Sequence, residues 1–210
     1  MIRVLIADDH AIVRRGLREL LGETSDIQAT AEATNGHEVL EKVREDDFDV
    51  LLLDISMPGK NGIDVLKDLR AEKQALPVLI LSMYPEEQYA VRALKAGASG
   101  YLAKDVAPES LIDAIRKVHS GGRYITSTLA ERLVLELSTQ NRKDLHLRLS
   151  DREYEVMRGI ASGKTVSEIA TDLSLSTKTV STYRDRTLKK MGMKTNAQLT
   201  HYAISRGLVG

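Results

Sequence analysis

The chain has 210 residues, of which 42% are hydrophobic and 29% are charged, and it contains no cysteine. This composition excludes an intrinsically disordered chain, a disulfide-stabilised fold and a Cys-ligated zinc site. The apolar run at residues 4–7 is cut off by two aspartates, and no later run approaches the roughly 18 residues of a membrane span. We therefore expect a soluble, cytoplasmic protein that makes no contact with a membrane.

The formal net charge is zero, but its sign changes along the chain. Residues 1–125 carry 16 Lys and Arg against 21 Asp and Glu, whereas residues 126–210 carry 14 against 9. An acidic half followed by a basic half predicts that only the second half binds a polyanion.

Short apolar runs alternate with amphipathic helical patterns over the first 120 residues. The predicted strands are residues 3–7, 27–31, 50–53, 78–81 and 100–103. Several are uninterrupted (VLI, VLLL, VLIL), as expected for parallel strands that are buried on both faces. Five strand-helix units in a row predict a doubly wound α/β domain with a five-stranded parallel sheet.

Residues 121–148 are expected to form a linker that contains a short amphipathic helix near residues 127–137. From residue 149 to residue 210 strand patterns are absent, and four helical patterns follow. Each begins with a residue that can cap a helix N-terminus: Ser150, Thr165, Ser176 and Thr195. We therefore expect an all-α four-helix domain at residues 149–210.

Charged and hydroxyl side chains follow four of the predicted strands: Asp8, Asp9, Asp54, Ser82 and Lys104. In a doubly wound sheet, ligands bind beyond the carboxyl ends of the strands, so we expect these side chains to share one crevice. Three carboxylates repel one another unless a cation neutralises them, and ligand sets of oxygen alone suit Mg²⁺. A carboxylate beside such a metal can act as a nucleophile toward a phosphoryl group.

The segments ADDH, LLLDISMPGKNG, LILSMY and GYLAKD resemble, in order and spacing, the receiver domains of response regulators. The resemblance implies a CheY-like fold, whose flavodoxin-like strand order is a known example of the doubly wound type. It implies that Asp54 is the phospho-acceptor and that Lys104 pairs with the phosphate. It also implies that Mg²⁺ is bound by Asp9, Asp54 and the Ser56 carbonyl, with Asp8 acting through a metal-bound water.

The same resemblance implies that Ser82 and Tyr101 form a switch pair. Taken singly, Ser82 is an ordinary strand-end hydroxyl and Tyr101 a core aromatic residue. His10, beside the two acids, is more often structural or solvated than functional. Many receivers have proline directly after the lysine, whereas this chain has Asp105, so no cis peptide bond is expected there.

Residues 166–191 match a helix-turn-helix, with the turn at residues 174–176 and the second helix entering the major groove. The segment from Leu149 onward resembles the LuxR-type output domain of NarL/FixJ response regulators. By position in that motif, Ser181, Thr182 and Asp185 would face the bases. The residues that would contact or flank the phosphate backbone are Lys178, Arg186 and Lys189. Family analogy also implies that the last helix mediates dimerisation.

Together the two resemblances imply a two-component response regulator, with a receiver at residues 1–120, a linker at 121–148 and a DNA-binding domain at 149–210. A sensor histidine kinase would phosphorylate Asp54 with Mg²⁺, which would switch homodimerisation and binding to a double-stranded DNA operator, and so transcription. Its only catalysis would be its own phosphoryl transfer and dephosphorylation.

Two other functions were weighed. A Mg²⁺-dependent phosphohydrolase typically needs a general acid carboxylate two residues after its nucleophile, where this chain has Ser56. An RNA-binding antiterminator or a pure protein-interaction regulator would leave the LuxR-like recognition helix unexplained.

Overall fold

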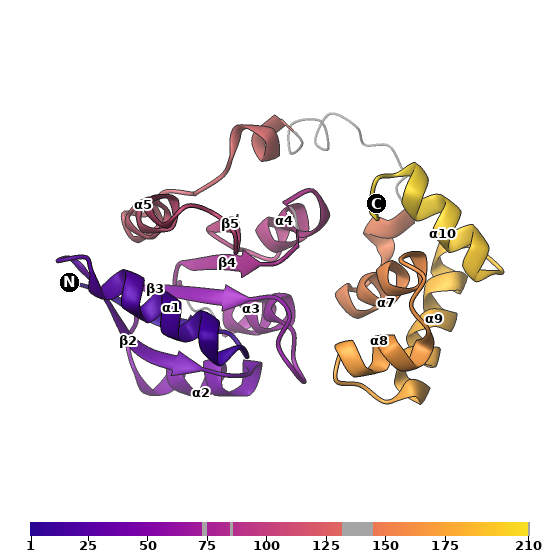
Figure 1. Ribbon diagram of the computed structural model, residues 1–210, viewed down its shortest axis with the longest axis horizontal. Coiled ribbons are helices and arrows are strands. Elements are labelled where there is room, and N and C mark those ends of the chain that lie inside the picture. The colour runs from indigo at the N-terminus through magenta and orange to yellow at the C-terminus, as the bar shows by residue number, and fades with distance from the viewer. Residues whose placement is uncertain (73–74, 85, 132–144, 210) are drawn as a thin grey trace. The chain divides into compact units, whose positions relative to one another are not determined.

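The computed structural model describes residues 1–72, 75–84, 86–131 and 145–209. The chain divides into two compact units, Met1–Leu135 and Glu136–Gly210. Figure 1 shows the helices and strands of both units.

The first unit is built on one sheet of five parallel strands. They are β1 (Ile2–Ala7), β2 (Ile27–Ala33), β3 (Val50–Asp54), β4 (Val78–Ser82) and β5 (Gly100–Ala103), in the spatial order β2-β1-β3-β4-β5. The predicted doubly wound sheet is therefore confirmed. Strand order reverses between β1 and β3, so the ends of these two strands flank the crevice where this topology binds ligands.

Five helices cover the two faces of the sheet: α1 (Ala11–Gly22), α2 (Gly36–Glu45), α3 (Gly62–Ala71), α4 (Glu86–Lys95) and α5 (Pro108–His119). Side chains of α1 and α5 pack on one face against a core that includes Val4, Ile6 and Leu52. The strand residues that alternate with these, such as Leu5 and Leu51, are also fully buried. The continuous apolar runs of the sequence are therefore strands of a sheet that helices cover on both faces.

The chain after α5 packs back onto the same unit. Tyr124 forms a parallel β-bridge with Gly100 at the start of β5. The Thr126 hydroxyl donates a 2.6 Å hydrogen bond to the Glu86 carboxylate at the start of α4, and Leu129 is buried. The first part of the predicted linker is therefore attached to the α/β unit.

Residues 127–131 are helical, as the sequence predicts. The rest of the short helix predicted at residues 127–137 lies outside the described residues.

The described part of the second unit, residues 145–209, contains the 3₁₀ turn η1 (Leu145–Arg148) and four α-helices: α7 (Asp151–Ala161), α8 (Val166–Asp172), α9 (Thr177–Met191) and α10 (Asn196–Ser205). The four predicted caps are all present, and those at Ser150, Thr165 and Thr195 form complete capping boxes. The all-α domain is thus confirmed. Its core is formed by Val156, Met157, Ile160, Ile169, Ala170, Val180, Leu188, Met191, Leu199 and Ala203.

A four-residue turn joins α8 to α9. Ser174 adopts a left-handed backbone conformation with φ of 53°, and the Leu175 N–H donates to the Ala170 carbonyl at 2.8 Å. Where α7 crosses α8, a Cβ on Gly159 would lie 2.7 Å from the Ile169 side chain, so this crossing requires glycine. Within the described part of the chain, no helix has the length and hydrophobicity that spanning a membrane would need.

Candidate functional site

Three charged side chains meet at the carboxyl ends of β1, β3 and β5. The Lys104 ammonium lies 2.6 Å from Asp8 Oδ2 and 2.9 Å from Asp54 Oδ2. Asp8 and Asp54 are 1% and 2% exposed, so both carboxylates share one buried cation. The sequence predicted this convergence from strand ends alone, and the structure brings these three residues together.

The pocket holds two carboxylates and one ammonium group, and this imbalance of charge, together with burial, shifts the pKa values of Asp54 and Lys104. Burial raises the pKa of Asp54, Lys104 opposes this effect, and the nearby Asp8 charge adds to it. Burial alone would lower the pKa of Lys104, but Asp54 and Asp8 outweigh burial and raise it, so the ammonium stays charged. Two carboxylates against one ammonium leave a negative pocket, which favours a bound cation.

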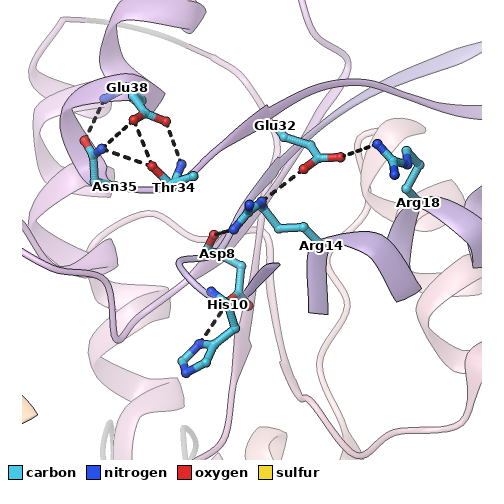
Figure 2. A network of polar contacts seen from close by, with 8 residues as sticks. All are labelled: Asp8, His10, Arg14, Arg18, Glu32, Thr34, Asn35 and Glu38. Atoms are coloured by element: carbon cyan, nitrogen blue, oxygen red, sulfur yellow. Dashed lines mark hydrogen bonds and ion pairs between the residues drawn. The ribbon is translucent and has the colours of Figure 1, made fainter. Parts of the chain in front are cut away.

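Asp9 and His10 lie beside this pair, where the chain enters α1. The His10 Nδ1 atom lies 2.8 Å from Asp9 Oδ1. It lies 3.3 Å from Asp8 Oδ1 (Figure 2). One ligand atom from each of Asp8, Asp9, His10 and Asp54 lies within 4.8 Å of the others. Three carboxylates this close fit a hard divalent cation such as Mg²⁺. His10, for which the sequence favoured a structural or solvated role, lies at the edge of this cluster.

The loop after β3 folds tightly around Asp54. A Cβ on Gly62 would lie 2.1 Å from the Asp54 carbonyl oxygen, so only glycine fits at the start of α3. The Gly62 N–H donates to the Ile55 carbonyl at 2.9 Å, and the Ser56 N–H bonds the Asp54 carboxylate. The Ser56 side chain is exposed. The role of its carbonyl as a metal ligand stays a prediction.

Ser82, the last residue of β4, and Tyr101, the second residue of β5, are both fully buried. The Tyr84 N–H donates to the Ser82 hydroxyl at 3.1 Å, and the Tyr101 hydroxyl donates to the Tyr84 carbonyl at 2.7 Å. The Tyr101 side chain lies inside the protein, and the two residues of the predicted switch pair are thus joined through the backbone of Tyr84.

In the second unit, α9 presents a polar face opposite its core residues. Lys178, Thr182, Asp185 and Lys189 are exposed and recur at spacings of four, three and four residues, which places them on one side of the helix. Arg186 is also exposed, and Ser181 is half-buried. The residues predicted to contact DNA are thus accessible on the second helix of the helix-turn-helix.

Both halves match known families. Residues 4–116 match the response regulator receiver domain. Residues 147–203 match the bacterial regulatory proteins of the luxR family. The chain belongs to the response regulator family.

Whole-length relatives agree with this assignment. The response regulator UvrY of Escherichia coli K12 is 36% identical over 209 residues, covering 99% of this chain and 96% of UvrY. The oxygen regulatory protein NreC of Staphylococcus aureus MRSA252 is 36% identical over 215 residues, covering 99% of each. These relatives are of the NarL/FixJ type, as the sequence motifs implied.

Solved structures of response regulators are also similar. RcsB of Salmonella enterica serovar Typhimurium, bound to promoter rprA in the presence of phosphomimetic BeF₃⁻, matches with a TM-score of 0.63 and 29% identity, covering 98% of this chain and 100% of RcsB. ChrA, of a heme-sensing two-component system, matches with a TM-score of 0.54 and 33% identity, covering 99% of this chain and 98% of ChrA. This response regulator therefore has a receiver domain and a LuxR-type DNA-binding domain.

Proposed function

We propose that Asp54 of this response regulator accepts a phosphoryl group from a sensor histidine kinase in a Mg²⁺-dependent reaction. The single observation that carries the proposal is the buried Asp54 carboxylate, which lies 2.9 Å from Lys104 and beside Asp8. Asp8, Asp9, Asp54 and the Ser56 carbonyl would hold the metal. When bound, Mg²⁺ supplies positive charge that the pocket lacks.

The transfer makes one bond and breaks one. An Asp54 carboxylate oxygen attacks the phosphorus of the phosphohistidine, the P–N bond breaks, and the imidazole leaves with the electron pair. Lys104, which lies within reach of Asp54, then pairs with the phosphoryl oxygens. Their negative charge takes the place of the carboxylate charge. Water later cleaves the acyl phosphate and regenerates Asp54. The family to which the chain belongs consists of regulators, so this self-directed chemistry is the only catalysis we assign.

Phosphorylation would control DNA binding through dimerisation. We assign the receiver to residues 1–120, the linker to 121–148 and the output domain to 149–210. A dimer of receivers holds two output domains near each other, which raises affinity for paired half-sites without any new base contact. On α9, Ser181, Thr182 and Asp185 would read bases, and the phosphate contacts would come from Lys178, Arg186 and Lys189. The promoter-bound structures of RcsB, a relative, support this mode.

The test is phosphorylation by acetyl phosphate, followed by intact mass, with Mg²⁺ or with a chelator. Wild type should gain one phosphoryl group only with Mg²⁺, and Asp54→Asn should gain none. The same stoichiometry on Asp54→Asn would refute the assignment. Turnover of a small phosphomonoester would instead favour a phosphohydrolase, and binding of RNA but not duplex DNA would favour an antiterminator.

A further inference from the structure

Arg14 contacts the backbone of the metal-binding acids. Its Nη1 donates a 2.8 Å hydrogen bond to the carbonyl oxygen of Asp8. That carbonyl belongs to the peptide unit that joins Asp8 to Asp9. Because a peptide unit is planar, fixing its carbonyl restricts the direction in which the chain leaves Asp8 and reaches Asp9. The contact therefore helps to set the positions of the Asp8 and Asp9 carboxylates relative to each other.

Arg14 is itself held by a second partner on β2. Its Nε donates to Glu32 Oε2 at 3.0 Å, and the Arg14 side chain is only 13% exposed. The other Glu32 oxygen accepts a 3.0 Å bond from Arg18 Nη1 (Figure 2). One guanidinium thus bridges the carbonyl between the two acids and a carboxylate on the neighbouring strand.

These contacts close a ring around Asp8. Its N–H donates to the carbonyl of Ala33 at 3.1 Å, and Ala33 follows Glu32 in β2. Asp8 is therefore fixed on its N–H side by the β2 backbone and on its carbonyl side by Arg14, which β2 also holds. The end of β1 is anchored at two points, directly before the acids that would bind the cation.

We propose that Arg14 is a positioning residue for the cation site, acting through the Asp8 carbonyl, and that Glu32 orients it. This inference rests on the proposed function of the acidic pocket. Groups that orient metal ligands typically change metal affinity about 10–100-fold when they are removed. Arg14 contacts the peptide between two acids rather than a carboxylate, so we expect a loss of about tenfold, at the lower end of that range.

Arg14→Lys is the most informative variant because it keeps the positive charge but removes the fixed donor directions of the guanidinium. A lysine ammonium is a single point of donation, whereas the guanidinium presents donors in two fixed directions. Arg18→Gln is the matched control, because among the described residues Arg18 contacts the same Glu32 carboxylate, whereas the hydrogen bond to the Asp8 carbonyl comes from Arg14. Glu32→Gln is a second variant, which keeps Arg14 and weakens the hold on it.

The experiment measures Mg²⁺ affinity of the full chain by calorimetry, together with the thermal midpoint of each variant. Arg14→Lys should raise the Mg²⁺ Kd about tenfold, Glu32→Gln should raise it by less, and Arg18→Gln should stay within about twofold of wild type, which is about 0.4 kcal/mol. The rate of phosphorylation by acetyl phosphate in Arg14→Lys should recover as Mg²⁺ is raised to saturation. A loss of fold would instead lower the midpoint and would not recover with Mg²⁺.

Equal Mg²⁺ Kd values for Arg14→Lys and Arg18→Gln would overturn the inference. If Arg14→Lys fails to fold, a Glu32→Gln protein with wild-type Kd would overturn it equally. Suppose that the wild type binds Mg²⁺ and gains phosphate, while Arg14→Lys and Arg18→Gln have the same Kd. The proposed function then stands, and only the role of Arg14 is refuted. A wild type that binds no Mg²⁺ refutes the proposed function, and the role of Arg14 with it.

Discussion

Ser82 and Tyr101 are linked through the backbone of one residue: Tyr84 donates its N–H to the Ser82 hydroxyl and accepts the Tyr101 hydroxyl at its carbonyl. A movement of Ser82 toward a phosphoryl group would therefore pull on the same peptide segment that holds Tyr101 inside. Phosphorylation would then act by shifting the population between an inward and an outward position of Tyr101.

Ser82→Ala should uncouple phosphorylation from its consequences. The variant should still gain phosphate on Asp54, because Ser82 has no assigned part in the attack, but its gain in dimerisation and in paired-site affinity should be much reduced. Sedimentation and DNA titration of the phosphorylated proteins measure both. Tyr101→Phe is the partner variant, which keeps the ring and removes one hydrogen bond worth about 1 kcal/mol. Equal gains in wild type and Ser82→Ala would show that the switch does not run through this hydroxyl.

Asp54→Asn should stabilise the receiver in the absence of metal. Burial and Asp8 raise the pKa of Asp54, so the ionised form costs folding free energy at pH above that raised pKa. Removing the charge should raise the thermal midpoint of the receiver by about 3–5 °C, the shift of about 1 kcal/mol in a domain of this size. The difference in thermal midpoint between Asp54→Asn and wild type should shrink as pH falls, because wild-type Asp54 then becomes protonated and loses its charge. Asp9→Asn, at a more exposed acid, should change the midpoint less.

Lys178→Ala or Lys189→Ala should weaken binding to all DNA sequences alike. Each lost phosphate contact should reduce the slope of log affinity against log salt by about one. Thr182→Ala or Asp185→Ala should instead change sequence preference. Salt titrations on two operators distinguish the effects, with Lys67→Ala on the receiver as a neutral control. An unchanged preference in both base-facing variants would refute the placement of the recognition helix.

The output domain should lose stability in acid through Glu153. Burial acts to raise the pKa of this carboxyl, but bonds from Lys190 and Ser150 outweigh it and lower the pKa. A lowered folded-state pKa gives stability that is present above the ordinary Glu value and is lost as pH falls through the folded value. The window therefore lies below about pH 4.5.

Glu153→Gln tests this assignment. Glutamine can still reach back to the Ser150 N–H, so the capping box survives and only the charge is removed. The midpoint of the output domain should be lower than in wild type at neutral pH and should converge with it in acid. A constant difference between the two proteins over that range would count against Glu153.

Periodicity predicted the five strands to within two residues, because strands buried on both faces read as continuous apolar runs. The largest error was at β2, which extends to Ala33 rather than ending at residue 31. Glu32 and Ala33 continue the strand by pairing with Ile6 and Ala7 of β1. The Glu32 charge is paired with two arginines on α1, which lie 14 and 18 positions away, so no local pattern predicts this pairing.

Only part of the site could be predicted from the sequence. Asp8, Asp54 and Lys104 could be predicted, because each lies at or directly after the end of a strand and topology brings strand ends together. The contact from Arg14 to the Asp8 carbonyl could not, because a backbone acceptor leaves no mark on residue type. The inward position of Tyr101 is a matter of side-chain rotamer, which tertiary packing decides. Adjacency to the acids was the one signal available for His10.

The bridge between Tyr124 and Gly100 lies at the outer edge of the sheet, since β5 is a terminal strand. An open strand edge is a template on which another chain can add, and proteins cover such edges to avoid aggregation. The segment after α5 thus shields the start of β5 as well as leading to the next domain. A fragment cut at residue 120 would expose that edge, whereas one that continues through Leu129 would keep it covered and would be the better choice for isolating the receiver.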